Sequence, residues 1–261
     1  MAWFAMVLAH LLVLFLVFVM PYRGIKRYET LKRRVDRHPE LRRRFYVQGM
    51  LSQWLLLVPL AVIVFGLGWS GPVLGLQAPA NLWLWGPIAL VLILLIYAQV
   101  FAMRRLTRTA DGIGQLRESL AGPLHMLPRT ALERALWVPL SLTAGVCEEV
   151  LYRGFLPAYL VHVFPGVPLL FGVIIAAVLF CIGHFYVLIS VGRFSQKMAN
   201  VLGIGVIGLV FGFLYYFTGS LLLPIIVHAL LDMRLVFIDV PGLVNASEAA
   251  KDAEASAAQP L

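Results

Sequence analysis

The chain has 261 residues, of which 61% are hydrophobic and only 13% are charged, and its formal net charge is +8. Soluble domains carry about a quarter charged residues, so this composition excludes an ordinary soluble domain and predicts an integral membrane protein. The apolar runs lack the polar–apolar alternation that is typical of outer-membrane barrels. We therefore expect an all-α fold, a polytopic bundle of transmembrane helices.

Seven apolar runs predict the membrane spans in chain order. Each is close to the ~20 residues that cross ~30 Å of hydrocarbon as a helix. They cover residues 3–20, 50–69, 82–103, 136–161, 167–189, 199–217 and 220–238. We expect about seven spans, with six and eight as alternatives, because the fourth run has no sharp ends.

Basic residues alternate with uncharged loops along these spans. They gather between Arg23 and Arg44 and again between Arg104 and Arg134, whereas the loops at 70–81, 163–166 and 218–220 carry no charge. Cytoplasmic loops are the ones enriched in lysine and arginine. The pattern predicts a multi-pass protein of the cytoplasmic (inner) membrane, with its N-terminus outside and its C-terminus inside.

The most basic stretch, residues 23–44, interleaves its positive charges with tyrosine, leucine, valine and phenylalanine. Such a pattern is typical of an interfacial helix or hairpin that lies on anionic lipid headgroups. A solvated cytoplasmic loop is the alternative. A nucleic-acid partner is not expected.

The chain divides into three regions by the placement of its ionisable residues. Residues 1–129 form an accessory region of three spans with basic cytoplasmic loops, and residues 130–240 hold nearly every charged group at membrane depth. We expect this second region to be a four-helix catalytic core, opened by a capping box of Thr130 and Glu133. The polar, alanine-rich residues 241–261 are expected to be a disordered tail.

The first candidate motif is Glu148-Glu149 followed by Arg153, within an apolar run. Ionisable groups at membrane depth are costly and mark functional sites. On a helix, Glu149 and Arg153 share a face and can form an ion pair, whereas Glu148 points about 100° away. A structural salt bridge explains Glu149 and Arg153 but leaves Glu148 as a candidate general base or acid.

Two further motifs place histidines on later spans. Phe180 precedes His184 by four residues, and His228 precedes Asp232 by four residues. Each histidine alone could be a satisfied core residue or could join two helices. Together with Glu148 they supply a base, groups that orient water and donors for an oxyanion. Hydrolysis within the membrane is the simplest chemistry that uses all of them.

The ordered motifs resemble the CAAX prenyl protease and bacteriocin-processing (CPBP, ABI) family of intramembrane proteases. That family has two glutamates and an arginine, then a phenylalanine four before a histidine, then a histidine four before an asparagine or aspartate. The resemblance covers roughly residues 130–238 and implies an endopeptidase acting on a membrane protein or on a lipid-anchored peptide.

By matching positions, the resemblance implies that Glu148 and His184 activate water and that His228 and Asp232 stabilise or position the oxyanion. Glu149, Arg153 and Phe180 would support the site. An ionised aspartate cannot donate a hydrogen bond to an oxyanion, so the role of Asp232 stays open between stabilising the oxyanion and positioning it. In a zinc-dependent alternative, Glu148, His184 and His228 would bind Zn²⁺. A second alternative is a non-catalytic membrane protein, of the bacteriocin self-immunity or folding-assistance type, that binds a peptide at the same cluster.

Overall fold

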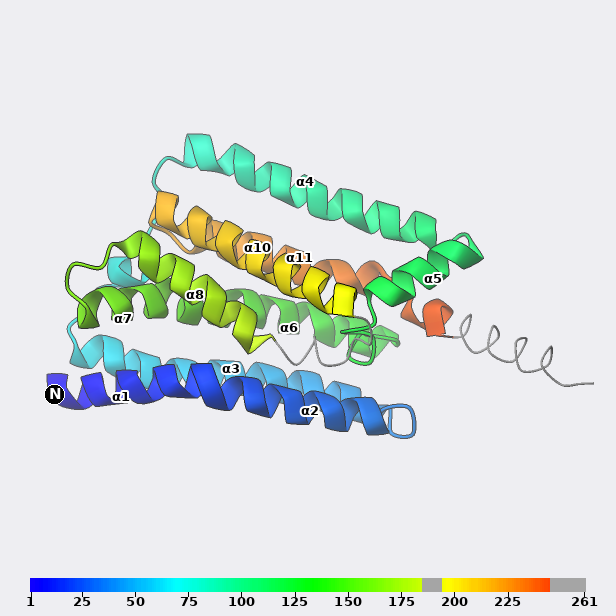
Figure 1. Cartoon of the computed structure of the whole chain (residues 1–261), viewed down its shortest axis with the longest axis horizontal. Helices are drawn as coiled ribbons and strands as arrows, with labels where there is room; N and C mark the ends of the chain where they lie inside the picture. The colour runs from blue at the N-terminus through cyan, green and yellow to red at the C-terminus, as the bar shows by residue number, and fades with distance from the viewer. Residues whose placement is uncertain (185–193, 245–261) are drawn as a thin grey trace, which may run out of the picture.

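The computed structural model describes residues 1–184 and 194–244, and in that part of the chain every regular element is a helix. This confirms the all-α prediction. Most of the helices run side by side along the long axis of the molecule (Figure 1). Residues 241–244 of the predicted disordered tail are helical, and Leu243 is buried in an apolar cluster. The rest of that tail, from residue 245, and the last residues of the predicted span 167–189 lie outside the described residues.

An N-terminal hairpin forms one side of the molecule (Figure 1). Helix α1 (Ala2–Leu14) continues through the π-helical turn η1 (Phe15–Val19) into α2 (Met20–Arg34), and α3 (Glu40–Gly66) returns beside it. The predicted basic stretch is therefore the tip of a helical hairpin.

The opposite side is formed by α4 (Leu82–Leu106), which leads into the short helix α5 (Ala110–Ser119) (Figure 1). Large apolar side chains of α4, such as Trp83 and Leu95, are exposed. Exposure of such an apolar surface to water would cost free energy, whereas in a membrane the lipid tails cover it.

Four helices in the described part of the chain are long and apolar enough to cross a membrane: Ala2–Arg34, Glu40–Gly66, Leu82–Leu106 and Lys197–Thr218. The chain is thus a multi-pass membrane protein.

The glutamates lie on a helix with an irregular middle. Helix α6 (Ala131–Glu149) passes into the π-helical turn η3 (Val150–Phe155) and on into α7 (Leu156–Val163). The predicted capping box is confirmed: the Glu133 amide donates to Thr130 Oγ1 at 3.2 Å, and the Thr130 amide donates to Glu133 Oε2 at 3.0 Å. The π turn begins directly after Glu149, and such turns occur often at functional sites.

Three further helices follow α7 along the chain. These are α8 (Leu169–Gly183), α10 (Phe194–Thr218) and α11 (Leu222–Met233), which the 3₁₀ turn η4 (Arg234–Phe237) extends. Helix α11 has 12 residues, or about 18 Å, which is shorter than the predicted run 220–238 and shorter than the hydrocarbon layer. It packs against α6, α4 and α10.

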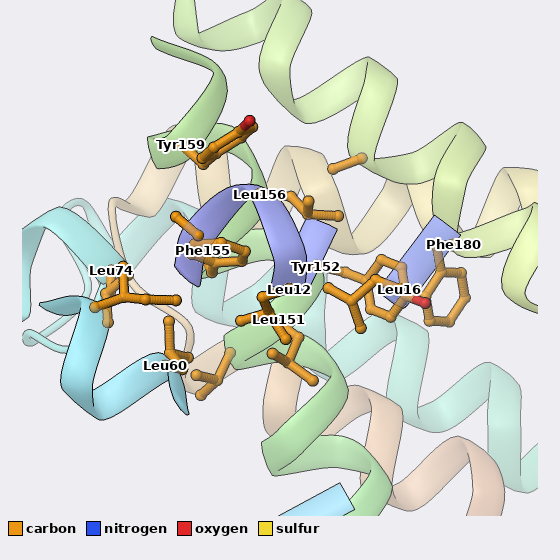
Figure 2. Packing of buried hydrophobic residues seen from close by; sticks show 14 of the residues in the cluster. Leu12, Leu16, Leu60, Leu74, Leu151, Tyr152, Phe155, Leu156, Tyr159 and Phe180 are labelled. Atoms are coloured by element: carbon orange, nitrogen blue, oxygen red, sulfur yellow. The ribbon is translucent and has the colours of Figure 1, made fainter. Parts of the chain in front are cut away.

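Apolar packing holds the π turn against the N-terminal hairpin. Leu151 and Phe155 of η3 are buried in one cluster with Leu12 of α1, Leu16 of η1 and Leu60 of α3 (Figure 2). Between helices in a bilayer, such contacts stabilise through close van der Waals packing rather than through removal of apolar surface from water. This cluster places the glutamate-bearing helix beside the hairpin.

Close packing of α6 on α11 depends on Gly145, one turn before the glutamates. A Cβ atom at this position would lie 3.0 Å from both Ala229 Cβ and Ile225 O on α11. Both neighbours belong to a packed helix and cannot rotate away. Gly145 therefore permits the approach that brings His228 to the glutamates.

We expect Gly145→Ala to lower the free energy of unfolding by about 1–3 kcal/mol, the usual effect of overpacking a close contact. Unfolding in detergent micelles, followed by circular dichroism, measures it. The control is Gly114→Ala on α5, because no atom lies within 4 Å of the added Cβ. Equal stability of the Gly145→Ala variant and the wild type would contradict the packing argument.

Candidate active site

Glu149 is the centre of a buried polar cluster. Its Oε1 accepts a hydrogen bond from Arg153 at 2.8 Å and a second from His228 Nδ1 at 2.6 Å. Arg153 also donates to Gly208 O at 3.2 Å, and its guanidinium lies 4.2 Å from the centre of the Phe180 ring. The predicted pair of Glu149 and Arg153 is confirmed. The bond to His228 was missed, because Arg153 already accounted for Glu149.

The bond to Glu149 orients the His228 ring. Since Nδ1 carries the proton that it donates to the carboxylate, Nε2 is the nitrogen turned toward the other acidic residues. This Nε2 lies 3.6 Å from Asp232 Oδ2 and 4.0 Å from Glu148 Oε2. Asp232 lies one turn after His228 on α11, as the sequence spacing predicted.

His184 approaches the same carboxylate from α8. It follows the last residue of that helix, and its Nδ1 donates to Phe180 O at 2.8 Å. Its Nε2 lies 3.7 Å from Glu148 Oε2. Two imidazoles on two helices therefore turn Nε2 toward one oxygen of Glu148.

The two oxygens of Glu148 have different surroundings. Oε1 accepts a hydrogen bond from Gln53 Nε2 at 3.3 Å. Oε2 is buried and has no hydrogen-bond partner in the described part of the chain, although both histidines face it. The oxygen nearest the histidines is thus the one whose hydrogen-bonding capacity is not used by the described residues.

Gln53 is a site residue that the sequence analysis missed. It belongs to α3, within the region predicted to be accessory. The only available signal was weak: Gln53 is an uncharged polar residue in an apolar run, and a buried amide needs a partner. The residue type alone does not indicate which residue that partner is.

A cavity of about 410 Å³ borders the cluster. Glu148, His184, His228 and Asp232 line it together with Gln53, and apolar side chains such as Leu140, Phe180 and Ile207 form other parts of its wall. The side chains of His184 and Asp232 are 23% and 37% exposed, so water reaches the cluster. The structure therefore places the four predicted catalytic residues around one space.

The same geometry bears on the zinc alternative. In residues 1–184 and 194–244, no group of three His, Cys, Asp or Glu side chains is arranged to hold a metal ion. Zinc ligands with bonds of about 2.0–2.1 Å lie roughly 3.4 Å apart in a tetrahedron. The two Nε2 atoms lie 3.7 and 4.0 Å from Glu148 Oε2. As placed, both nitrogens are therefore a few tenths of an ångström too far from Glu148 Oε2 to share a zinc ion with it.

A helical multi-pass membrane protein with buried glutamates and histidines around a cavity has the features of an intramembrane hydrolase. Residues 130–234 match the family described as Type II CAAX prenyl endopeptidase Rce1-like. Residues 130–234 thus form a domain of this family, whose members are proteases that act on protein or peptide substrates. Comparisons with curated proteins and with solved structures found no match.

Proposed function

We propose that the chain is an endopeptidase that cleaves membrane-anchored or membrane-proximal substrates, with water activated by Glu148 and His184. The observation that carries this proposal is the convergence of His184 Nε2 and His228 Nε2 on Glu148 Oε2 at the wall of the cavity. Water held between Glu148 and His184 has a base on one side and an orienting nitrogen on the other.

In the first step, Glu148 Oε2 removes a proton from the water while its oxygen attacks the substrate carbonyl carbon. The resulting tetrahedral intermediate carries an oxyanion. In its doubly protonated form, His228 keeps its Nδ1 bond to Glu149 and turns an Nε2–H donor toward this oxyanion. Glu148 then gives its proton to the leaving nitrogen as the C–N bond breaks. The products are a carboxylic acid and an amine.

We assign Asp232 to orienting His228. An ionised carboxylate only accepts hydrogen bonds, so it cannot stabilise an oxyanion directly. Its Oδ2 lies 3.6 Å from His228 Nε2, close enough to hold the ring in place and to favour a proton on that nitrogen.

The proposed placement in the membrane has about seven spans in the cytoplasmic membrane, with the N-terminus outside and the C-terminus inside. The four long apolar helices support it, as does the basic last turn of α2, Lys32, Arg33 and Arg34. In this orientation the tip of the N-terminal hairpin meets anionic headgroups on the cytoplasmic side, and the cavity opens there.

The purified chain in liposomes, given membrane-tethered reporter peptides, tests the proposal by mass spectrometry of the products. We expect cleavage by the wild type and a kcat lower by about 10²–10³-fold for His184→Ala, because the water loses its orienting group. His162→Ala is the matched control, since His162 does not line this cavity.

Peptide that binds to the wild type but is never cleaved would support the non-catalytic alternative instead. Repeating the assay after treatment with a chelator, with metal content measured, tests the zinc alternative. Activity that disappears and returns with added Zn²⁺ would contradict the metal-free mechanism.

A further inference from the structure

Helix α3 reaches the candidate site from outside the family match, which covers residues 130–234. It packs directly on α6, and the indole of Trp54 donates to Thr143 Oγ1 at 3.1 Å. This contact holds the neighbouring residue, Gln53, opposite Glu148 on α6. The Gln53 side chain lines the cavity and donates to Glu148 Oε1 at 3.3 Å.

We propose that Gln53 is a positioning residue for the hydrolysis, which selects Oε2 of Glu148 as the oxygen that acts on water. This inference rests on the proposed function. A carboxylate can rotate about its last bond and exchange its two oxygens. By holding Oε1, Gln53 restrains that rotation and keeps Oε2 facing His184 and His228.

The amide of Gln53 also matches both protonation states of Glu148. Its Nε2 donates to the ionised carboxylate, and its Oε1 is buried without a hydrogen-bond partner in the described structure. When Glu148 gains a proton on Oε2, its Oε1 remains a carbonyl oxygen that can still accept from the Gln53 amide. Gln53 therefore holds the base before and after proton transfer.

Gln53 holds Glu148 without adding a charge to the buried cluster. Glu148 is already faced by His184 from α8, by His228 and Asp232 from α11, and by Glu149 and Arg153 from its own helix. At this position α3 contributes a neutral amide, so the cluster gains a hydrogen bond with no new repulsion or attraction.

Two substitutions test the role in the reporter-peptide assay. We expect Gln53→Leu, which is similar in size but cannot hydrogen-bond, to lower kcat by about 10–100-fold, as misplaced catalytic groups do. KM should change by less than about threefold, because the peptide contacts remain.

We expect Gln53→Glu to behave differently across pH. A protonated glutamic acid can donate to Glu148 Oε1 as the amide does, whereas two ionised carboxylates repel each other. The activity of the Gln53→Glu variant should therefore approach that of the wild type at low pH and fall below it as the pH rises. Gln53→Leu should stay low at every pH.

Leu51→Ala is the control on the same helix, since Leu51 is 65% exposed and does not line the cavity. A kcat of Gln53→Leu within twofold of the wild type would overturn the inference. Equal losses of kcat in both Gln53 variants at all pH values, together with a lower unfolding temperature, would also overturn it, because that result indicates a purely structural role. If the wild type and Glu148→Gln are equally inactive on every reporter, the proposed function itself fails.

Discussion

Glu148→Gln should lower kcat by about 10⁴-fold, the upper range for loss of a general base. The substitution keeps the size of the side chain and its oxygen acceptor, so Gln53 can still donate to it. It removes the group that takes a proton from water and returns it to the leaving nitrogen. Single-turnover cleavage of a tethered peptide by the purified variant measures the effect, with binding of the same peptide followed separately.

Glu118→Gln is the matched control, because Glu118 is exposed on α5 and does not line the cavity. Glu148→Asp should retain more activity than Glu148→Gln, since it keeps a base and withdraws it by one methylene group. Cleavage at the wild-type rate by Glu148→Gln would contradict the mechanism.

Arg42→Met should destabilise the protein by about 3–5 kcal/mol, the usual cost of leaving one partner of a buried ion pair unpaired. Arg42 of α3 donates to Glu133 Oε1 at 2.9 Å, and both side chains are 2% exposed. Arg42 also donates to His125 O at 3.1 Å. The loss would loosen the hairpin from the start of α6, and unfolding in micelles measures it.

Combining Arg42→Met with Glu133→Gln should recover part of that loss, because no charge is then buried alone and the amide oxygen can still accept from the Thr130 amide. The comparison pair is Arg129 with Asp36, whose side chain is 64% exposed and lies 3.4 Å from the guanidinium. Asp36→Asn should therefore change stability by only about 0–1 kcal/mol. If the Glu133 substitution lowers the stability of the Arg42→Met variant as much as it lowers that of the wild type, the two side chains act independently.

Local spacing predicted the parts of this site that lie within one helix. Residues four apart share a helical face, so Glu149 with Arg153 could be paired from the sequence, and so could His228 with Asp232. Thr130 and Glu133 likewise follow a spacing rule that acts over three residues.

Contacts between helices could not be predicted in this way. The bond from His228 to Glu149 joins residues 79 positions apart, and the bond from Gln53 to Glu148 joins residues 95 positions apart. Both depend on how α3 and α11 pack on α6, which no periodicity in one helix records. The irregular turn after Glu149 left no mark in the apolar pattern either.

The short length of α11 determines how deep the chemistry lies. Asp232 is next to the last residue of that helix, and His228 is five residues from the same end, or about 8 Å along the axis. On the proposed function, both side chains therefore act within about 8 Å of the end of α11, and the protease would select peptide bonds that reach this level beside the helix.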